Sequence, residues 1–197
     1  MILTLQAIVD AMAVGFRAAD GRSPQHISRT GRAYRPGIGP HSENAAVTLV
    51  LAEIGTLLPG TPYGQFLPYP NAPRQKCDVW LGKPAEWAIE VKMARFRGDN
   101  GKPDDTAVKD LLSPYASDRS ALTDCEKLAV SGFPCRTALL VYGFDYPDRA
   151  LDPAIDALEL LAGATVELGS RVEAVIGDLV HPVHAYGRLF AWEVHPS

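Results

Sequence analysis

Cysteine is scarce in this 197-residue sequence, and its three cysteines lack any C-x-x-C spacing. Cys77, Cys125 and Cys135 therefore indicate neither a disulfide framework nor a zinc ribbon, and free thiols in a reducing compartment are the simplest interpretation. The sequence has no apolar run long enough to cross a bilayer, and its first residues lack the basic segment of a signal peptide. We therefore expect a cytoplasmic protein with no membrane partner.

Several signatures of other enzyme classes are also missing. The sequence has no P-loop and no G-x-S-x-G elbow, so ATP use, a nucleotide cofactor and serine hydrolysis have no support. His181 and His184 could hold a metal, but no third ligand lies near them in the sequence, and we interpret them as surface histidines. Cys125 or Cys135 could act as a nucleophile with a distant histidine, but their apolar surroundings favour buried structural thiols.

Charge is unevenly distributed along the chain, although the net charge is only −4 at pH 7. Residues 22–102 carry eleven Lys or Arg and six acids, a balance of +5, so the rest of the chain carries −9. One phosphate-facing surface on an otherwise acidic body would give this division, and so would scattered solvated charges. The residues that we assign to nucleic-acid binding are Arg32, Arg35, Arg74, Arg95, Arg97 and Lys102.

The pattern of apolar residues predicts a single α/β domain with a central mixed β-sheet flanked by helices. Helices are expected at residues 2–20, 42–58, 106–112, 117–131 and 153–162, and strands at 76–81, 86–93 and 136–144, with a short strand near 65–67. Residues 173–179 and 188–194 fit either a strand or a helix. The domain spans 1–197: a helix and an irregular arm (1–40), a core (42–144) and a segment that completes the core (145–197).

The expected hairpin of residues 76–81 and 86–93 gathers polar groups that could carry chemistry. Side chains alternate along a strand, so the apolar residues of 87–93 share one face, while Glu90 and Lys92 lie side by side on the other. Asp78 is on the partner strand. Carboxylates at one point hold a hard divalent cation, and a nearby ammonium can orient or deprotonate water. The same residues are also compatible with an exposed strand face that carries alternating charges.

Asp78 and the triplet Glu90-Val91-Lys92 resemble the PD-(D/E)xK nuclease superfamily, which has the restriction-endonuclease-like fold. The order of elements over residues 42 to 144 agrees with that family, although Cys77 stands where a proline often precedes the aspartate. The resemblance implies that Asp78 and Glu90 bind Mg²⁺, with Mn²⁺ as an alternative, and that Lys92 positions or activates a water molecule.

The family often adds a glutamate from a preceding helix, and Glu43 stands at the start of the apolar helix expected at 42–58. The resemblance implies that Glu43 assists through the metal or its waters. An acid in a first helical turn is also favoured by the helix macrodipole alone.

Together these features predict a Mg²⁺-dependent deoxyribonuclease of the restriction or host-defence type, and cutting both strands of DNA would favour a homodimer. Two alternatives remain: a structure-specific repair, recombination or phage-type nuclease, and a non-catalytic nucleic-acid-binding subunit that keeps the fold. We interpret the polar residues that follow the hairpin as helix surface; these are Lys109, Asp110, Tyr115, Asp118 and Arg119.

Overall fold

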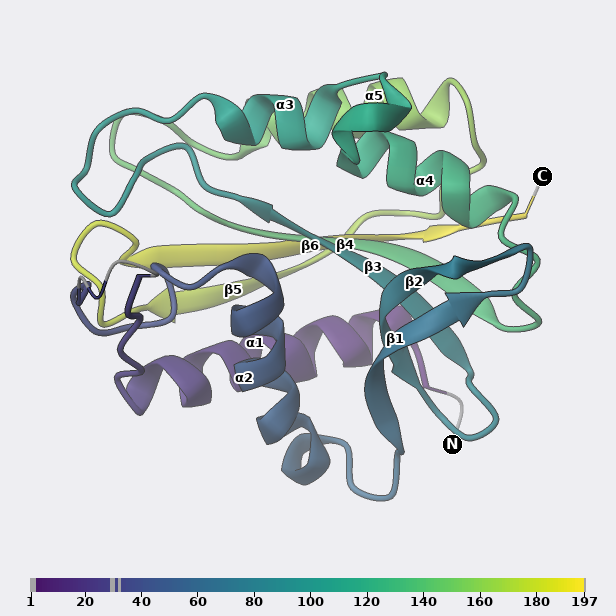
Figure 1. Ribbon diagram of the computed structural model, residues 1–197, viewed down its shortest axis with the longest axis horizontal. Helices are drawn as coiled ribbons and strands as arrows, with labels where there is room; N and C mark the ends of the chain where they lie inside the picture. Colours follow the sequence, from purple (N-terminus) through teal and green to yellow (C-terminus); the bar gives the residue numbers. More distant parts are fainter. Residues whose placement is uncertain (1–2, 29–30, 32, 197) are drawn as a thin grey trace.

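A computed structural model describes residues 3–28, 31 and 33–196, which form a six-stranded sheet covered by helices on both faces (Figure 1). One face is covered by α1 (Leu5–Gly21) and α2 (Glu43–Leu57). The other face is covered by α3 (Thr106–Leu112), α4 (Ala121–Ala129) and α5 (Asp152–Gly163). The prediction of a mixed α/β fold with a central sheet flanked by helices is therefore confirmed.

The sheet has the strand order β1-β2-β3-β4-β6-β5. Its strands are β1 (Tyr63–Tyr69), β2 (Ala72–Leu81), β3 (Trp87–Ala94), β4 (Arg136–Phe144), β5 (Val172–Asp178) and β6 (Tyr186–Val194). β3 and β4 are parallel, and all other neighbours are antiparallel. Because a parallel pair needs a crossover, the chain passes through α3 and α4 on its way from β3 to β4.

The strands with the clearest sequence patterns occupy their predicted places. β2 and β3 form the expected antiparallel hairpin, and β4 has the predicted bounds. The two C-terminal segments for which strand and helix were both open are both strands, β5 and β6. They pair with each other, and β6 also pairs with β4, so they form the edge of the sheet beyond β4.

The first two helices follow from their apolar spacing. Thr4 caps α1 by accepting a hydrogen bond from the Ala7 amide, and the helix buries a stripe that includes Ile8, Met12 and Phe16 against the sheet. Ser42 occupies the N-cap position of α2 but makes no side-chain capping bond. Within the described ranges, no helix has the length and apolar character needed to cross a membrane.

The helix predicted at 117–131 begins later than expected. A short 3₁₀ turn, η1 (Ala116–Asp118), is followed by Arg119 in the left-handed conformation, with φ 52° and ψ 46°. This residue breaks the helical path, so α4 starts at Ala121, where the Ser120 hydroxyl accepts a hydrogen bond from the Thr123 amide at 3.2 Å. Because of this break, the predicted helix is divided into the short turn η1 and the separate helix α4.

Both faces of the two central strands are buried. β4 is buried from Thr137 to Phe144, and the side of β3 that carries Glu90 is covered as well, since Glu90 is only 3% exposed. The alternative of a solvated, charge-alternating strand face is therefore wrong. A charged side chain in such a place needs partners, because burial without them is costly.

Candidate active site

Asp78 and Glu90 meet where β2 and β3 separate. Backbone pairing ends with Val79 opposite Ile89, so Asp78 and Glu90 occupy the next position on the two strands. Beyond that point the β3 amides on this edge need other acceptors. The Asp78 carboxylate provides one: its Oδ2 accepts a hydrogen bond from the Val91 amide at 2.8 Å.

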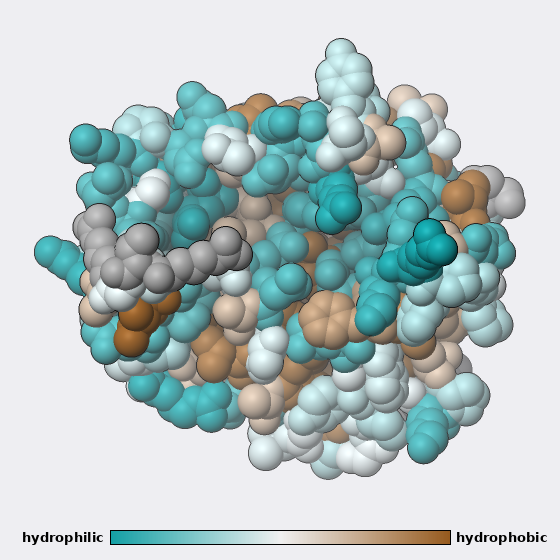
Figure 2. All heavy atoms as spheres, viewed as in Figure 1, coloured by the Kyte–Doolittle hydropathy of each residue, from teal (hydrophilic) through white to brown (hydrophobic). Residues whose placement is uncertain are grey.

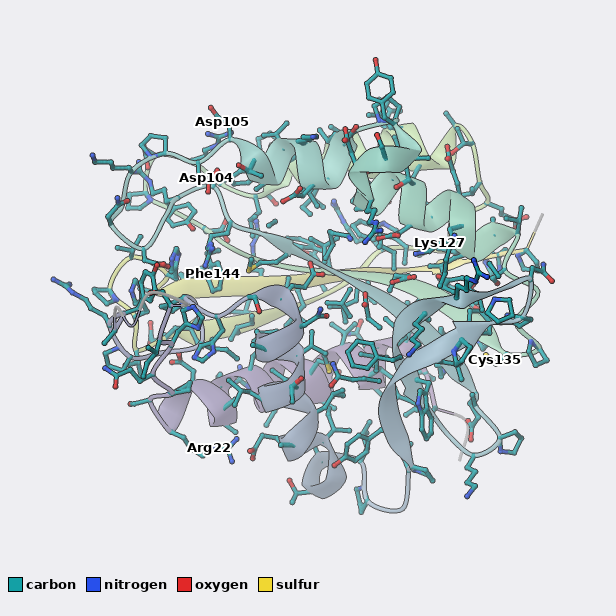
Figure 3. The ribbon with its side chains drawn as sticks, viewed as in Figure 1. Arg22, Asp104, Asp105, Lys127, Cys135 and Phe144 are labelled. Carbon is teal, nitrogen blue, oxygen red and sulfur yellow. The ribbon has the colours of Figure 1, made fainter. Side chains whose placement is uncertain are left out.

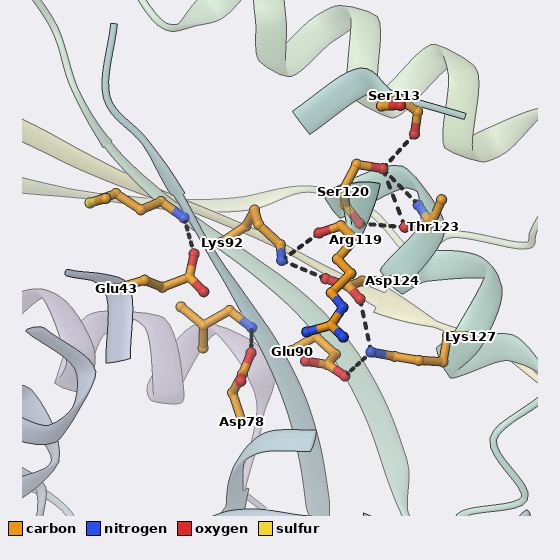
Figure 4. Close-up of polar contacts among 12 residues, drawn as sticks. Glu43, Asp78, Glu90, Lys92, Ser113, Arg119, Ser120, Thr123, Asp124 and Lys127 are labelled. Atoms are coloured by element: carbon orange, nitrogen blue, oxygen red, sulfur yellow. Dashed lines mark hydrogen bonds and ion pairs between the residues drawn. The ribbon is translucent and has the colours of Figure 1, made fainter. Parts of the chain in front are cut away.

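Glu43, the first residue of α2, extends the same edge. Its Oε2 accepts a hydrogen bond from the Met93 amide at 2.7 Å, one alternation beyond the amide that Asp78 accepts from. The carboxylates of Asp78 and Glu43 thus accept hydrogen bonds from the β3 amides that β2 does not pair with, and Figure 4 shows them along β3. The structure therefore brings Glu43 to the residues of the hairpin.

Lys92 lies on the same face of β3 as Glu90, beneath α4. Its ammonium is 2.9 Å from the Arg119 carbonyl and 2.8 Å from Asp124 Oδ2, and its side chain is 13% exposed (Figure 4). Lys92 is therefore held from two sides by the segment that begins α4.

Three further residues that the sequence did not point to complete the site. Tyr69 on β1 donates a hydrogen bond to Glu90 Oε1, and the Lys127 ammonium lies 2.6 Å from the same oxygen. Lys127 is also 2.8 Å from Asp124 Oδ1, so Asp124 links the two lysines. Figure 3 places Lys127 between α4 and the β1–β2 hairpin. The only available signal was the spacing of Asp124 and Lys127, which puts both on one face of a helix.

The carboxylate cluster, by which we mean Glu43, Asp78, Glu90 and Asp124, carries more charge than the lysines balance. Four carboxylates face two ammonium groups, those of Lys92 and Lys127, so full ionisation leaves an excess of two negative charges. Buried charges of one sign repel strongly. The excess must therefore be met by protons or by a cation.

The pKa values of the site reflect this crowding. Burial raises the pKa of Glu90 to about 7, and the neighbouring Asp78 adds to the effect. Burial also raises the pKa values of Asp78 and Glu43. Burial would lower the pKa of Lys127, but Glu90 and Asp124 raise it to about 12. The lysines thus stay charged while the acids retain protons more readily than usual, so a further cation would stabilise the ionised acids.

The donor set fits a hard divalent cation that keeps part of its water shell. Among the described residues, no group of three or more His, Cys, Asp or Glu side chains is arranged to hold a metal ion. Mg²⁺ does not require such a group, because it commonly binds through one or two carboxylates and retains several waters. Asp78 and Glu90 supply two carboxylates, which also share a hydrogen bond with each other, while Tyr69 and Lys127 both contact Oε1 of Glu90.

The basic residues assigned to nucleic-acid binding fall into two groups. Arg95 donates to the Gly39 carbonyl at 2.8 Å, and Arg97 donates to the Gly101 carbonyl and pairs with Asp148, so both hold loops together. The other described members, Arg35, Arg74 and Lys102, are exposed. The remaining member, Arg32, lies outside the described residues. Figure 2 shows that hydrophilic residues dominate the face on which α4 and the β1–β2 hairpin meet.

His181 and His184 are not surface residues, as the sequence suggested, but are both 0% exposed. His184 lies between the Tyr146 hydroxyl and Asp99, with both contacts at 3.0 Å, and His181 stacks on it. Burial lowers the pKa of His181 to about 4. The pair packs against the backbone at Gly37 and Gly39 and is distinct from the carboxylate cluster. Of the two cysteines expected to be buried, Cys125 is buried, whereas Cys135 is partly exposed.

Comparison with family models, with curated proteins and with solved structures found no match to this chain. The buried Glu90 carboxylate, the half-buried Asp78 carboxylate, Glu43 at the edge of the same strand and two ammonium groups are suited to binding a divalent cation beside a phosphate and to stabilising the charge that develops there.

Proposed function

We propose that this chain is a Mg²⁺-dependent nuclease that hydrolyses DNA phosphodiester bonds, with Mn²⁺ as an alternative metal. The observation that carries the proposal is the meeting of buried Glu90 with half-buried Asp78, in a cluster that would carry an excess of two negative charges if all four of its acids were ionised. The strand order around β2, β3 and β4, with α2 before and α3 and α4 after, supports assignment to the restriction-endonuclease-like fold.

Each residue of the site has a role in this proposal. Bound Mg²⁺ would supply a Lewis acid for the scissile phosphate and would lower the pKa of a coordinated water. Asp78 and Glu90 would hold the ion, and Glu43 would accept hydrogen bonds from its waters. The Lys92 ammonium, fixed by Asp124 and the Arg119 carbonyl, would orient the attacking water and offset negative charge on the phosphate.

A restriction or host-defence role is the biological setting that we propose for this activity. Cutting both strands of a duplex would require two such sites, so we also propose that the active form on DNA is a homodimer. Sedimentation of the protein with and without duplex DNA tests this part independently of cleavage.

The proposed activity is tested by incubating supercoiled plasmid with the wild type in Mg²⁺, in Mn²⁺ and in EDTA, beside Asp78→Ala and Lys92→Ala. We expect metal-dependent nicking by the wild type and a loss of at least about 100-fold in both variants, since each removes a group that stabilises the transition state. Circular dichroism of each variant separates loss of chemistry from loss of fold. Equal cleavage by all three proteins, or none with any metal, would overturn the proposal.

A further inference from the structure

Arg119 has a backbone conformation that its residue type does not favour. With φ 52° and ψ 46° it lies in the left-handed region, where glycine or asparagine is common and a bulky side chain is rare. The residues on either side fix it there. Asp118 accepts a hydrogen bond from the Ser113 hydroxyl at 2.6 Å, and Ser120, which is 0% exposed, caps α4. Strain of this kind persists where its surroundings impose it and gathers at functional sites.

The Arg119 backbone is part of the site already described, because its carbonyl accepts the hydrogen bond from Lys92 at 2.9 Å. Its side chain extends from that carbonyl toward the place where Glu90 and Lys127 meet (Figure 4). The hydrogen bond between Lys92 and the Arg119 carbonyl therefore links the position of the guanidinium to that of Lys92.

The Arg119 side chain is exposed, and no residue in the described ranges accepts a hydrogen bond from its guanidinium or pairs with it. Other arginines near the sheet behave differently: Arg97, Arg136 and Arg188 each pair with a carboxylate. Among the described residues Glu90 makes no hydrogen bond or ion pair with the Arg119 guanidinium; its Oε1 contacts Tyr69 and Lys127. The fork of donors on Arg119 therefore remains available at the edge of the carboxylate cluster.

We propose that Arg119 binds the DNA phosphate that lies over Asp78 and Glu90 during cleavage. A guanidinium presents a planar fork that matches two phosphate oxygens, and such charge-assisted pairs are strong. The left-handed backbone turns this fork toward the cluster, and the chain fixes that backbone through Lys92, Ser113 and Ser120. This inference rests on the proposed nuclease function and adds a substrate-binding residue from the segment before α4.

The test uses Arg119→Gly and Arg119→Asn, which remove the guanidinium but suit the left-handed backbone. Single-turnover cleavage of a DNA duplex, at saturating protein and in Mg²⁺, should slow roughly 10- to 100-fold, the range for loss of a hydrogen bond to a charged group. Affinity for the same duplex in Ca²⁺ should fall less than about tenfold, because other phosphate contacts remain. The melting temperature should stay within about 3 °C of the wild-type value or rise, since backbone strain is relieved. Arg119→Lys should recover part of the rate.

Ser23→Gly is the matched control, since Ser23 also has a φ of 52° but lies in the arm before α2. It relieves the same strain and should leave the cleavage rate unchanged. If the wild type cleaves and Arg119→Gly cleaves at the same rate, the role of Arg119 is wrong while the proposed function stands. If the wild type does not cleave with any metal, the proposed function and this role both fail.

Discussion

In the absence of metal, replacing Glu90 by glutamine should make the protein more stable at pH 8. Glu90 is 3% exposed, and burial together with Asp78 raises its pKa from 4.5 to about 7. That difference corresponds to about 3 kcal/mol between the protonated and the ionised carboxyl in the folded state. The wild type at pH 8 must ionise this group at a cost, whereas glutamine stays neutral.

The sign of the pH dependence follows from the same pKa. A carboxyl whose pKa is higher in the folded state than in the unfolded state binds its proton more tightly when folded. Its stabilisation is complete below pH 4.5 and is lost as the pH rises through about 7. The Glu90→Gln variant loses the ion pair with Lys127, whose ammonium lies 2.6 Å from Glu90 Oε1 in the wild type. We therefore expect a net gain of about 1 to 3 kcal/mol at pH 8 and almost none at pH 5.

Urea unfolding followed by circular dichroism, in EDTA at pH 5 and pH 8, measures this difference. Glu193→Gln is the control with the opposite sign, because hydrogen bonding to Arg136 lowers the pKa of Glu193. That variant should be less stable than the wild type at pH 8. The reasoning is refuted if Glu90→Gln is less stable than the wild type at pH 8, or if its gain is as large at pH 5.

Three further predictions concern stabilisation by Mg²⁺, the link that Asp124 makes between Lys92 and Lys127, and the buried carboxylate of Asp20. Millimolar Mg²⁺ at pH 8 should raise the melting temperature of the wild type but not of Glu90→Gln; equal shifts in differential scanning fluorimetry would argue against Glu90 as a ligand. Asp124→Asn should lower the free energy of unfolding by about 3 kcal/mol, because Lys92 and Lys127 both lose a buried ionic partner, and an unchanged urea midpoint would contradict this. Asp20→Ala should cost about 3 kcal/mol, because its buried carboxylate accepts hydrogen bonds from the backbone amides of Ile38 and Val180. Those two amides should exchange hydrogen faster, and unchanged protection would count against the role.

The sequence predicted the proximity of those residues whose positions depend on nearby residues in the chain. Strand alternation puts Glu90 and Lys92 on one face of β3, and the hairpin register sets Asp78 beside Glu90. Glu43 was proposed from the family resemblance, since it heads an apolar helix before the hairpin. The placement of Asp78, Glu90 and Lys92 needs only the periodicity of a strand and one tight connection.

The contacts from α4 and β1 could not be predicted in the same way. Lys127 and Tyr69 reach Glu90 because α4 crosses over β3 and because β1 pairs along β2, and neither arrangement is set by nearby residues. Arg119 was interpreted as helix surface because helical periodicity continues through it; its left-handed backbone ends the 3₁₀ turn instead.

The burial of His181 and His184 likewise could not be predicted from the local sequence. Two polar residues beside a proline favour a surface loop, but the backbone at Gly37 and Gly39 lies directly against them. A Cβ on Gly39 would lie 2.5 Å from the His184 Cβ, and one on Gly37, whose φ is +119°, would lie 2.9 Å from the His181 amide nitrogen. Such close backbone approach depends on the path of the whole arm, which local patterns do not define.

The central claim, that Asp78 and Glu90 bind the metal that cleaves DNA, is tested most directly by one comparison. Plasmid nicking is measured in Mg²⁺ and in EDTA for the wild type, for Asp78→Asn and for Glu193→Gln, which alters an acid away from the site. We predict Mg²⁺-dependent nicking by the wild type and Glu193→Gln, and none above the EDTA background by a folded Asp78→Asn. Nicking by Asp78→Asn at the wild-type rate would contradict the account.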